Sequence, residues 1–164
     1  MKKKIAILGS TGSIGKSLFD ILLKDKKKFQ IILLTAHKSH DVLLKQAKKF
    51  NVKNLILTNK KSYEILKKKT KNKDIKVFNN YSKFNLILKK KLDYVMSSIS
   101  GIEGLEPTVK IIRFTKKIAI ANKESIICGW NLILNELKIK KTEFIPVDSE
   151  HFSIWYGLKN YKNT

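Results

Sequence analysis

Cysteine, proline and glycine are all scarce in this chain of 164 residues, which has one, two and seven of them respectively. Because Cys128 is alone, neither a disulfide nor a cysteine metal cluster can form within the chain, and a reducing compartment is the simplest expectation. The few glycines and prolines leave no linker-like stretch. Since 43% of the residues are hydrophobic, the sequence predicts a folded domain with a substantial core rather than a disordered chain.

Acidic residues and arginine are scarce as well. Only 13 acidic residues balance 35 basic ones, so the formal net charge is +22, and Arg113 is the only arginine. Such a charge suggests a nucleic-acid partner, but nucleic-acid readers favour the bidentate guanidinium of arginine. The lysines are also spread along the chain, as on solvated helix faces. We therefore expect no nucleic-acid partner, and a salt-sensitive affinity for nucleic acid is the alternative that charge alone suggests.

Long hydrophobic runs are also missing. Four apolar residues separate the lysines at positions 2–4 from Gly9, which is too few for the core of a signal peptide. No apolar run approaches the roughly 20 residues that span a bilayer. The sequence therefore predicts a soluble protein with no membrane partner, located in the cytoplasm, or in the plastid stroma if the cell is eukaryotic, although no transit peptide is visible.

The start of the chain carries its most informative motif. An apolar run at residues 5–8 leads into Gly9, Gly12 and Gly15, and an amphipathic stretch follows at residues 16–23. This layout predicts a strand that turns through glycine into a helix N-terminus, where free N–H groups and the helix dipole bind phosphate. Gly9 would allow the tight turn, Gly12 the close approach of backbone to the anion, and Gly15 the packing of helix on strand. Because the spacing is not the common G-x-G-x-x-G, a glycine turn without a ligand is the alternative.

Strand-like and helix-like segments alternate along the rest of the chain. The predicted strands cover residues 5–8, 29–35, 54–58, 75–78, 93–99, 117–121 and 143–147. The predicted helices cover residues 13–24, 41–50, 62–69, 82–90, 106–113 and 123–137. Alternation of this kind forms βαβ units, and nearly continuous apolar strands are typical of a sheet covered on both faces. We predict an α/β fold with a doubly wound, mostly parallel, Rossmann-like sheet and helices on both faces.

Residues capable of chemistry follow several predicted strands. In a doubly wound sheet, ligands bind outside the carboxyl ends of the strands, so these segments should share one edge. The second strand is followed by His37, Lys38 and Ser39, with no acid before Asp41. An NAD site usually has an acid there for the ribose 2′-hydroxyl, whereas a basic residue suits a 2′-phosphate. The sequence therefore favours NADP over NAD, and the alternative is that Lys38 is one more surface lysine.

Two further segments lie at predicted strand ends. Asp148 and Glu150 follow the last strand, and two carboxylates at this spacing can converge on a hard divalent cation. Taken alone, they are better explained as an aspartate helix cap with a glutamate in the first turn. Lys123 follows the sixth strand, where its ammonium could meet a phosphate or an enolate oxygen, although lysine is also common at helix starts.

Three blocks together resemble the N-terminal part of the 1-deoxy-D-xylulose 5-phosphate reductoisomerase family. They cover residues 7–15, 121–125 and 146–151, and the small-residue loop at 97–104 before Pro107 is similar too. The resemblance implies an oxidoreductase and isomerase of non-mevalonate isoprenoid biosynthesis that depends on NADPH and on Mg²⁺ or Mn²⁺. Such an enzyme rearranges the sugar phosphate 1-deoxy-D-xylulose 5-phosphate and reduces it to 2-C-methyl-D-erythritol 4-phosphate.

The resemblance also implies roles for individual residues. The residues that would contact NADPH are Thr11, Gly12, Ser13, Ile14, His37, Lys38, Ser39, Asn122 and Glu124. Of these, His37 and Ser39 depart from the family's usual Gly-Lys-Asn-like turn. Those that would act on or touch the substrate are Lys123, Ser149 and Glu150, with Lys123 and Glu150 catalytic. Those that would ligate the metal are Asp148 and Glu150.

The resemblance divides the chain into an NADPH-binding domain, residues 1–147, and the start of a catalytic, metal-binding domain, residues 148–164. Family members continue well beyond this length, so we expect a fragment or a truncated gene product that is inactive alone, and a homodimer for the full-length protein. The alternative is another NADP-binding oxidoreductase domain, such as a homoserine dehydrogenase-like one. That alternative shares the first motif but does not predict the blocks at 122–125 and 148–151 together.

Overall fold

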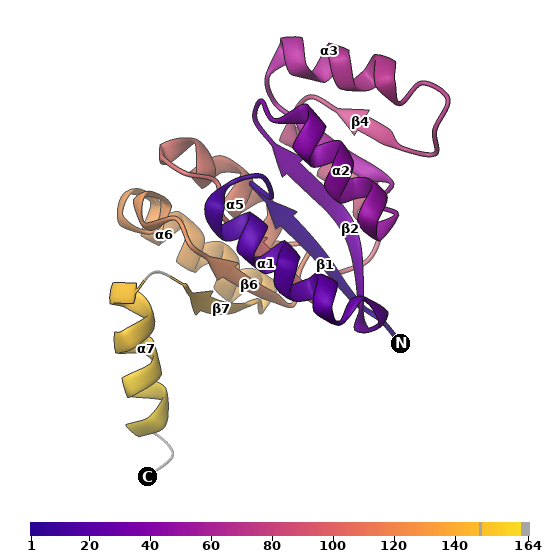
Figure 1. Ribbon diagram of the computed structural model, residues 1–164. Coiled ribbons are helices and arrows are strands. Elements are labelled where there is room, and N and C mark those ends of the chain that lie inside the picture. The colour runs from indigo at the N-terminus through magenta and orange to yellow at the C-terminus, as the bar shows by residue number, and fades with distance from the viewer. Residues whose placement is uncertain (148, 162–164) are drawn as a thin grey trace.

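The computed structural model describes the backbone of residues 1–147 and 149–161, and the side chains of residues 1–147 and 152–158. The described residues form one sheet whose strands are β1 (Lys3–Leu8), β2 (Phe29–Ala36), β3 (Asn54–Leu57), β4 (Lys76–Phe78), β5 (Tyr94–Ser97), β6 (Lys117–Ile120) and β7 (Glu143–Pro146). All pairs are parallel, in the order β4-β3-β2-β1-β5-β6-β7 (Figure 1). The predicted doubly wound sheet is confirmed, and every strand in it is parallel.

Helices cover both faces of this sheet. They are α1 (Ser13–Lys24), α2 (His40–Phe50), α3 (Lys60–Lys69), α4 (Phe84–Ile87), α5 (Leu105–Ile112), α6 (Lys123–Lys140) and α7 (Ser149–Tyr161). Short 3-10 turns cover Lys26–Lys28, Tyr81–Lys83 and Ile102–Gly104. Side chains of α1, α2 and α3 pack in one core cluster, and those of α4, α5 and α6 pack in the other. The crossover helices therefore cover one face of the sheet for the strands on one side of β1 and the other face for the strands beyond it, as in a doubly wound sheet.

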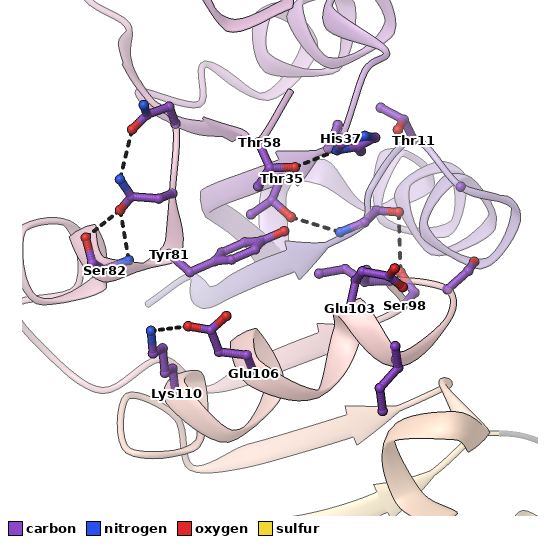
Figure 2. Close-up of a pocket in the computed structure, with 18 residues that line it drawn as sticks. Thr11, Thr35, His37, Thr58, Tyr81, Ser82, Ser98, Glu103, Glu106 and Lys110 are labelled. Carbon is purple, nitrogen blue, oxygen red and sulfur yellow. Dashed lines mark hydrogen bonds and ion pairs between the residues drawn. The ribbon is translucent and has the colours of Figure 1, made fainter. Parts of the chain in front are cut away.

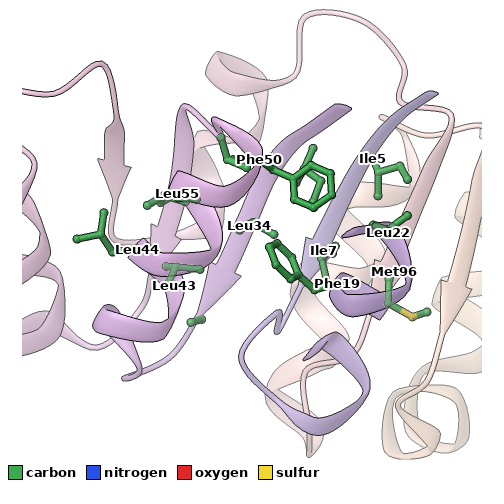
Figure 3. Packing of buried hydrophobic residues seen from close by; sticks show 14 of the residues in the cluster. Ile5, Ile7, Phe19, Leu22, Leu34, Leu43, Leu44, Phe50, Leu55 and Met96 are labelled. Atoms are coloured by element: carbon green, nitrogen blue, oxygen red, sulfur yellow. The ribbon is translucent and has the colours of Figure 1, made fainter. Parts of the chain in front are cut away.

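The two core clusters follow from the period of two along each strand. In β1, Ile5 and Ile7 point into one cluster while Ala6 and Leu8 point into the other, and all four are buried. Figure 3 shows the first cluster between α1, α2 and the sheet. There the rings of Phe19 and Phe50 meet edge to face with centroids 5.2 Å apart, which ties the two helices together.

Two helical segments differ from the prediction. The helix predicted over 82–90 is wrong, because only Phe84–Ile87 forms an α-helix there, after the 3-10 turn Tyr81–Lys83. Leu88 leaves the helical region at φ −104° and ψ 82°, and its side chain packs in the second core cluster. The extent of helix α7 was not predicted, since its apolar residues at 152, 154, 155, 156 and 158 form no single stripe. The explanation of Glu150 as a first-turn residue did anticipate a helix start, and Glu150 lies in the first turn of α7.

Helix α7 extends away from the body of the sheet in Figure 1. Ile154, Tyr156 and Leu158 are exposed on it, while the rings of Phe152 and Tyr156 stack with centroids 5.8 Å apart. Apolar side chains on α7 therefore lie largely outside both core clusters. Among the described residues, none of the helices is both long enough and apolar enough to span a membrane.

Candidate functional site

An open cleft of about 950 Å³ lies at the carboxyl edge of the sheet. It is lined by segments that follow five strands (Figure 2). These are Gly9, Thr11 and Gly12 after β1, Thr35–His37 at the end of β2, Thr58 after β3, residues 79–82 after β4, and residues 98–100, 102 and 103 after β5. Because β1 lies between β2 and β5, the chain reverses its direction of winding at this point. That is where open α/β sheets bind ligands. The segments predicted to follow the first, second and fifth strands meet in this cleft.

Steric limits explain two of the three glycines after β1. Gly9 has φ 76°, and a Cβ placed on it would lie 2.6 Å from the carbonyl oxygen of Ser98. A Cβ on Gly15 would lie 2.3 Å from the carbonyl oxygen of Gly9. Neither residue can carry a side chain without moving backbone. The predicted tight turn at Gly9 and close packing at Gly15 are confirmed.

Gly12 plays a different part. Its φ of −75° and ψ of 174° are extended, and a Cβ on it would lie no closer than 3.4 Å to the carbonyl oxygen of Gly9. The fold therefore does not require a glycine there. The first helical hydrogen bond of α1 runs from the amide of Lys16 to the carbonyl of Gly12, so the amides of Ser13, Ile14 and Gly15 precede any helical partner. Gly12 supplies no side-chain cap to these amides, which lie at a helix N-terminus beside the cleft. Amides in that position suit an anion, because their N–H groups and the helix dipole favour negative charge.

The turn after β2 carries the residues predicted to face a 2′-phosphate. His37 lines the cleft, and its Nδ1 lies 2.8 Å from the hydroxyl of Thr58. Lys38 and Ser39 are exposed and lie outside the cleft lining. The first acid after β2, Asp41, bonds Lys69 Nζ at 2.7 Å, and this hydrogen bond is the main reason that the pKa of Asp41 is lowered. No acid therefore lines the cleft at the end of β2, among the residues that the structure describes.

The opposite wall of the cleft was not predicted. Tyr81 lines it, where burial raises the pKa of its phenol and a side-chain hydrogen bond with Thr35 opposes that rise. Glu103 and Glu106 also line it, and Glu106 forms an ion pair with Lys110 on the next turn of α5. No motif in the sequence marks these residues: Tyr81 lies in the 3-10 turn before α4, Glu103 in the 3-10 turn after β5, and Glu106 in α5.

The N-terminus of α6 holds three of the predicted site residues. Asn122 is 3% exposed, and its Oδ1 accepts a hydrogen bond of 2.7 Å from the amide of Ser125. Its Nδ2 donates to the carbonyls of Ile99 and, at 2.7 Å, Gly101. Asn122 thus caps α6 and holds the loop after β5 in place. Lys123 and Glu124 are exposed in the first turn of α6, outside the cleft lining.

The structure thus brings three predicted residues together in the cleft lining: Thr11, Gly12 and His37. It places the others on segments at the same carboxyl edge, outside that lining: Ser13, Ile14, Lys38, Ser39, Asn122, Lys123 and Glu124. The predicted metal ligand Asp148 lies outside the described residues. Ser149 and Glu150 begin α7, and their side chains are not among those described. Within the described part of the chain, no three His, Cys, Asp or Glu residues gather as metal ligands would.

The sheet order and the glycine turn at its switch point define an open, doubly wound α/β domain of the Rossmann-like class. The chain belongs to the 1-deoxy-D-xylulose 5-phosphate reductoisomerase family, whose model matches residues 5–129. It is 59% identical over 162 residues to the 1-deoxy-D-xylulose 5-phosphate reductoisomerase of Pelagibacter ubique (strain HTCC1062), and this match covers 98% of the chain and 42% of the relative. The chain thus spans about two fifths of the length of the curated relatives that it matches.

Solved structures of the same family agree with the sequence match. The Zymomonas mobilis reductoisomerase in complex with NADPH superposes with a TM-score of 0.84 and 30% identity, over 92% of this chain and 40% of that one. A second reductoisomerase, in complex with NADPH, fosmidomycin and magnesium, has a TM-score of 0.82 and 30% identity over 91% of this chain and 37% of that one.

A homoserine dehydrogenase from Thiobacillus denitrificans is 15% identical with a TM-score of 0.55, over 90% of this chain and 29% of that one. At that identity the likeness shows the fold alone. The Rossmann-like sheet is therefore common to the two protein classes, and the family match decides between them in favour of the reductoisomerases.

Proposed function

We propose that this chain is the NADPH-binding part of an enzyme that rearranges 1-deoxy-D-xylulose 5-phosphate and reduces it to 2-C-methyl-D-erythritol 4-phosphate. The observation that carries the proposal is the glycine turn after β1, which leaves the amides of Ser13, Ile14 and Gly15 without helical partners beside an open cleft. Membership of the reductoisomerase family and the NADPH in a related solved structure support it.

The residues of the cleft fit a dinucleotide phosphate. At Gly9 the backbone of Ser98, and at Gly15 the backbone of Gly9, lies too close to leave room for a Cβ. Because Gly12 has no side chain, the space in front of the helix N-terminus stays open. We assign the pyrophosphate to Thr11, Gly12 and the first amides of α1, where positive charge from the dipole favours an anion. His37, Lys38 and Ser39 would face the 2′-phosphate. When bound, NADPH would supply the hydride for the reduction.

Lys123, in the exposed first turn of α6, would meet the substrate. Asn122 and Glu124 would contact the cofactor, and Asn122 would also hold the loop after β5 in place. Asp148 and Glu150 would ligate Mg²⁺ or Mn²⁺, and Ser149 and Glu150 would contact the substrate. Residues 1–147 would form the cofactor-binding domain and 148–164 the start of the catalytic one. We further propose a cytoplasmic location and a homodimer for the full-length enzyme.

The cofactor assignment is tested by titrating the purified protein with NADPH and NADH and following nucleotide fluorescence. We expect tighter binding of NADPH, because the β2 turn offers Lys38 and the cleft shows no acid there. Lys38→Ala should narrow the difference by about 1–3 kcal/mol if a charge-assisted contact with the 2′-phosphate is lost. Lys49→Ala, another exposed lysine at the far end of α2, is the matched control and should leave the difference unchanged. Equal affinities for the two nucleotides in the unmodified protein would refute the assignment.

Activity is tested separately, by following NADPH oxidation with 1-deoxy-D-xylulose 5-phosphate and Mg²⁺ or Mn²⁺. We expect no turnover from these 164 residues alone, since two carboxylates leave a metal shell incomplete and curated relatives are more than twice as long. Substrate-dependent and metal-dependent turnover by the purified chain would contradict this expectation and show that the site is complete within it.

A further inference from the structure

Gln46 is a buried amide that the proposed cofactor contacts do not include. It lies on the core-facing stripe of α2 with Leu43, Ala47 and Phe50, and it is 6% exposed. A glutamine at such a position costs free energy unless both ends of its amide find hydrogen-bond partners. Its partners therefore reveal why a polar residue stands among apolar ones.

Both ends of the Gln46 amide bond one residue, Ser10, which is 36 positions earlier in the chain. Gln46 Nε2 donates to the carbonyl of Ser10 at 2.9 Å, and the hydroxyl of Ser10 donates to Gln46 Oε1 at 2.8 Å. Ser10 is completely buried. It lies between Gly9, which makes the tight turn, and Thr11, which lines the cleft. The contact thus reaches the backbone of the phosphate-facing turn itself.

The end of β2 completes the same network. The amide of Ser10 donates to the carbonyl of Thr35 at 2.9 Å, and the amide of Gly9 donates to the hydroxyl of Thr35 at 3.0 Å. Thr35 is buried and directly precedes Ala36 and the turn at His37. The glycine turn is therefore fixed to both β2 and α2, the two elements that carry the turn assigned to the 2′-phosphate.

We propose that Gln46 is a positioning residue for nucleotide binding. It holds the glycine turn at a fixed distance from the β2–α2 turn, so that one NADPH molecule can place its pyrophosphate on the first turn and its 2′-phosphate on the second. The inference rests on the proposed NADPH function. Gln46 does not itself line the cleft, and its side-chain hydrogen bonds go to Ser10, so its proposed effect passes through that residue. Its effect depends on geometry, because two phosphate groups joined by one ribose can be bound together only when their two sites keep a fixed separation.

A binding experiment separates this role from a purely structural one. Gln46→Met keeps the length and helix propensity of the side chain but removes both hydrogen bonds. NADPH probes both turns, whereas adenosine 2′-monophosphate carries only the 2′-phosphate. We expect Gln46→Met to weaken NADPH binding about tenfold and to change the affinity for adenosine 2′-monophosphate by less than twofold. The control is Gln30→Met, an exposed position on β2, which should alter neither.

Three results would overturn the inference. One is unchanged NADPH affinity in a folded Gln46→Met variant, even with a lower melting temperature, which would leave Gln46 with a structural role alone. Another is an equal loss of both probes, which would indicate general loosening. If Gln46→Met does not fold, Ser10→Ala removes the hydrogen bond from the Ser10 hydroxyl to Gln46, together with its longer bond of 3.3 Å to the carbonyl of Thr35. It should weaken NADPH binding about threefold, and unchanged binding there would be the third such result. Failure of the unmodified protein to bind NADPH would instead overturn the proposed function and the inference together.

Discussion

Two glycine loops flank the cleft, and they are held in similar ways but leave different backbone groups available to a ligand. The β1 loop, residues 9–12, contains Gly9 at φ 76°, and the β5 loop, residues 98–104, contains Gly101 at φ 77°. A buried amide side chain from elsewhere in the chain holds each one, Gln46 for the β1 loop and Asn122 for the β5 loop. Both loops are thus tied to distant elements rather than held by local turn chemistry alone.

The difference lies in what each loop leaves available. The β1 loop leads into the twelve-residue α1, whose first amides lack helical partners. The β5 loop leads into the 3-10 turn Ile102–Gly104 and then α5, and Asn122 occupies two of its carbonyls. The β1 loop therefore offers backbone donors to a ligand, whereas the β5 loop packs against it and supports it. Gly9 shows this directly, because the backbone of Ser98 fills the space where its Cβ would stand.

The largest expected loss of stability comes from Gly9→Ala in the β1 loop, and it is compared with the loss from Gly101→Ala in the β5 loop. Gly9→Ala adds a Cβ at 2.6 Å from the backbone of Ser98, in addition to the penalty of positive φ. We expect it to lower the free energy of unfolding by roughly 2–5 kcal/mol, the sum of the left-handed penalty and overpacking. Urea unfolding with an unchanged m-value measures this. A loss no greater than that of Gly101→Ala would show that the β1 loop can move away from the β5 loop.

Asn122→Ala should come next, because it removes the cap of α6 and leaves the carbonyls of Ile99 and Gly101 without this partner. The expected loss is roughly 2–3 kcal/mol in the same urea assay. Asn131→Ala, an exposed position on the same helix, is the matched control and should not destabilise. If the two variants unfold at the same urea concentration, Asn122 does not hold the β5 loop.

Gly101→Ala should have a smaller effect than either. Its φ of 77° carries the same backbone penalty as Gly9, but its added Cβ would meet only the carboxylate end of Glu103, at 2.8 Å. That flexible end can move aside, so we expect a loss of about 1–2 kcal/mol from the left-handed conformation alone. A loss as large as that of Gly9→Ala would mean that the β5 loop is as rigid as the β1 loop.

The smallest effect tests the role of Glu103 directly. Adding Glu103→Ala to the Gly101→Ala variant removes the one close contact of the new methyl group. We expect the free energy of unfolding to change by less than about 0.5 kcal/mol, as for an ordinary surface substitution. Recovery of most of the lost stability in the double variant would show that the side chain of Glu103 is held firmly and that sterics, not φ, dominate at Gly101.

How accurately the sequence predicted each helix depends on how local the causes of that helix are. Helix α1 has the predicted bounds at both ends, since a glycine turn starts it and its apolar stripe is regular. The prediction for residues 82–90 was wrong because Leu88 leaves the helical conformation and is buried in the second core cluster, whose members come from distant parts of the chain. For helix α7 only the start was anticipated, from Glu150 as a first-turn residue, because its apolar residues lack a stripe that would mark its length.

The candidate site divides in the same way. Thr11, Gly12 and His37 could be assigned from their place after predicted strands, because parallel strands bring their carboxyl ends to one edge. Tyr81 and Glu106 could not, since one lies in a 3-10 turn and the other within α5, and neither immediately follows a predicted strand. The sequence did carry one signal for Gln46, which is a polar residue on the apolar stripe of α2. Such a residue is expected to hydrogen-bond a buried partner, but the sequence does not show which residue that partner is.

By itself, the sequence determined the order of strands and helices, the parallel sheet that this order requires, and the glycines at the turn after β1. These depend on local periodicity and on backbone sterics, which nearby residues set. The tertiary structure alone decided that Ser10 would bond Gln46, that Asn122 would clamp the β5 loop, and that the backbone of Ser98 would fill the space beside Gly9. These contacts join residues 36, 21 and 89 positions apart, where only the packing of whole elements sets the distance.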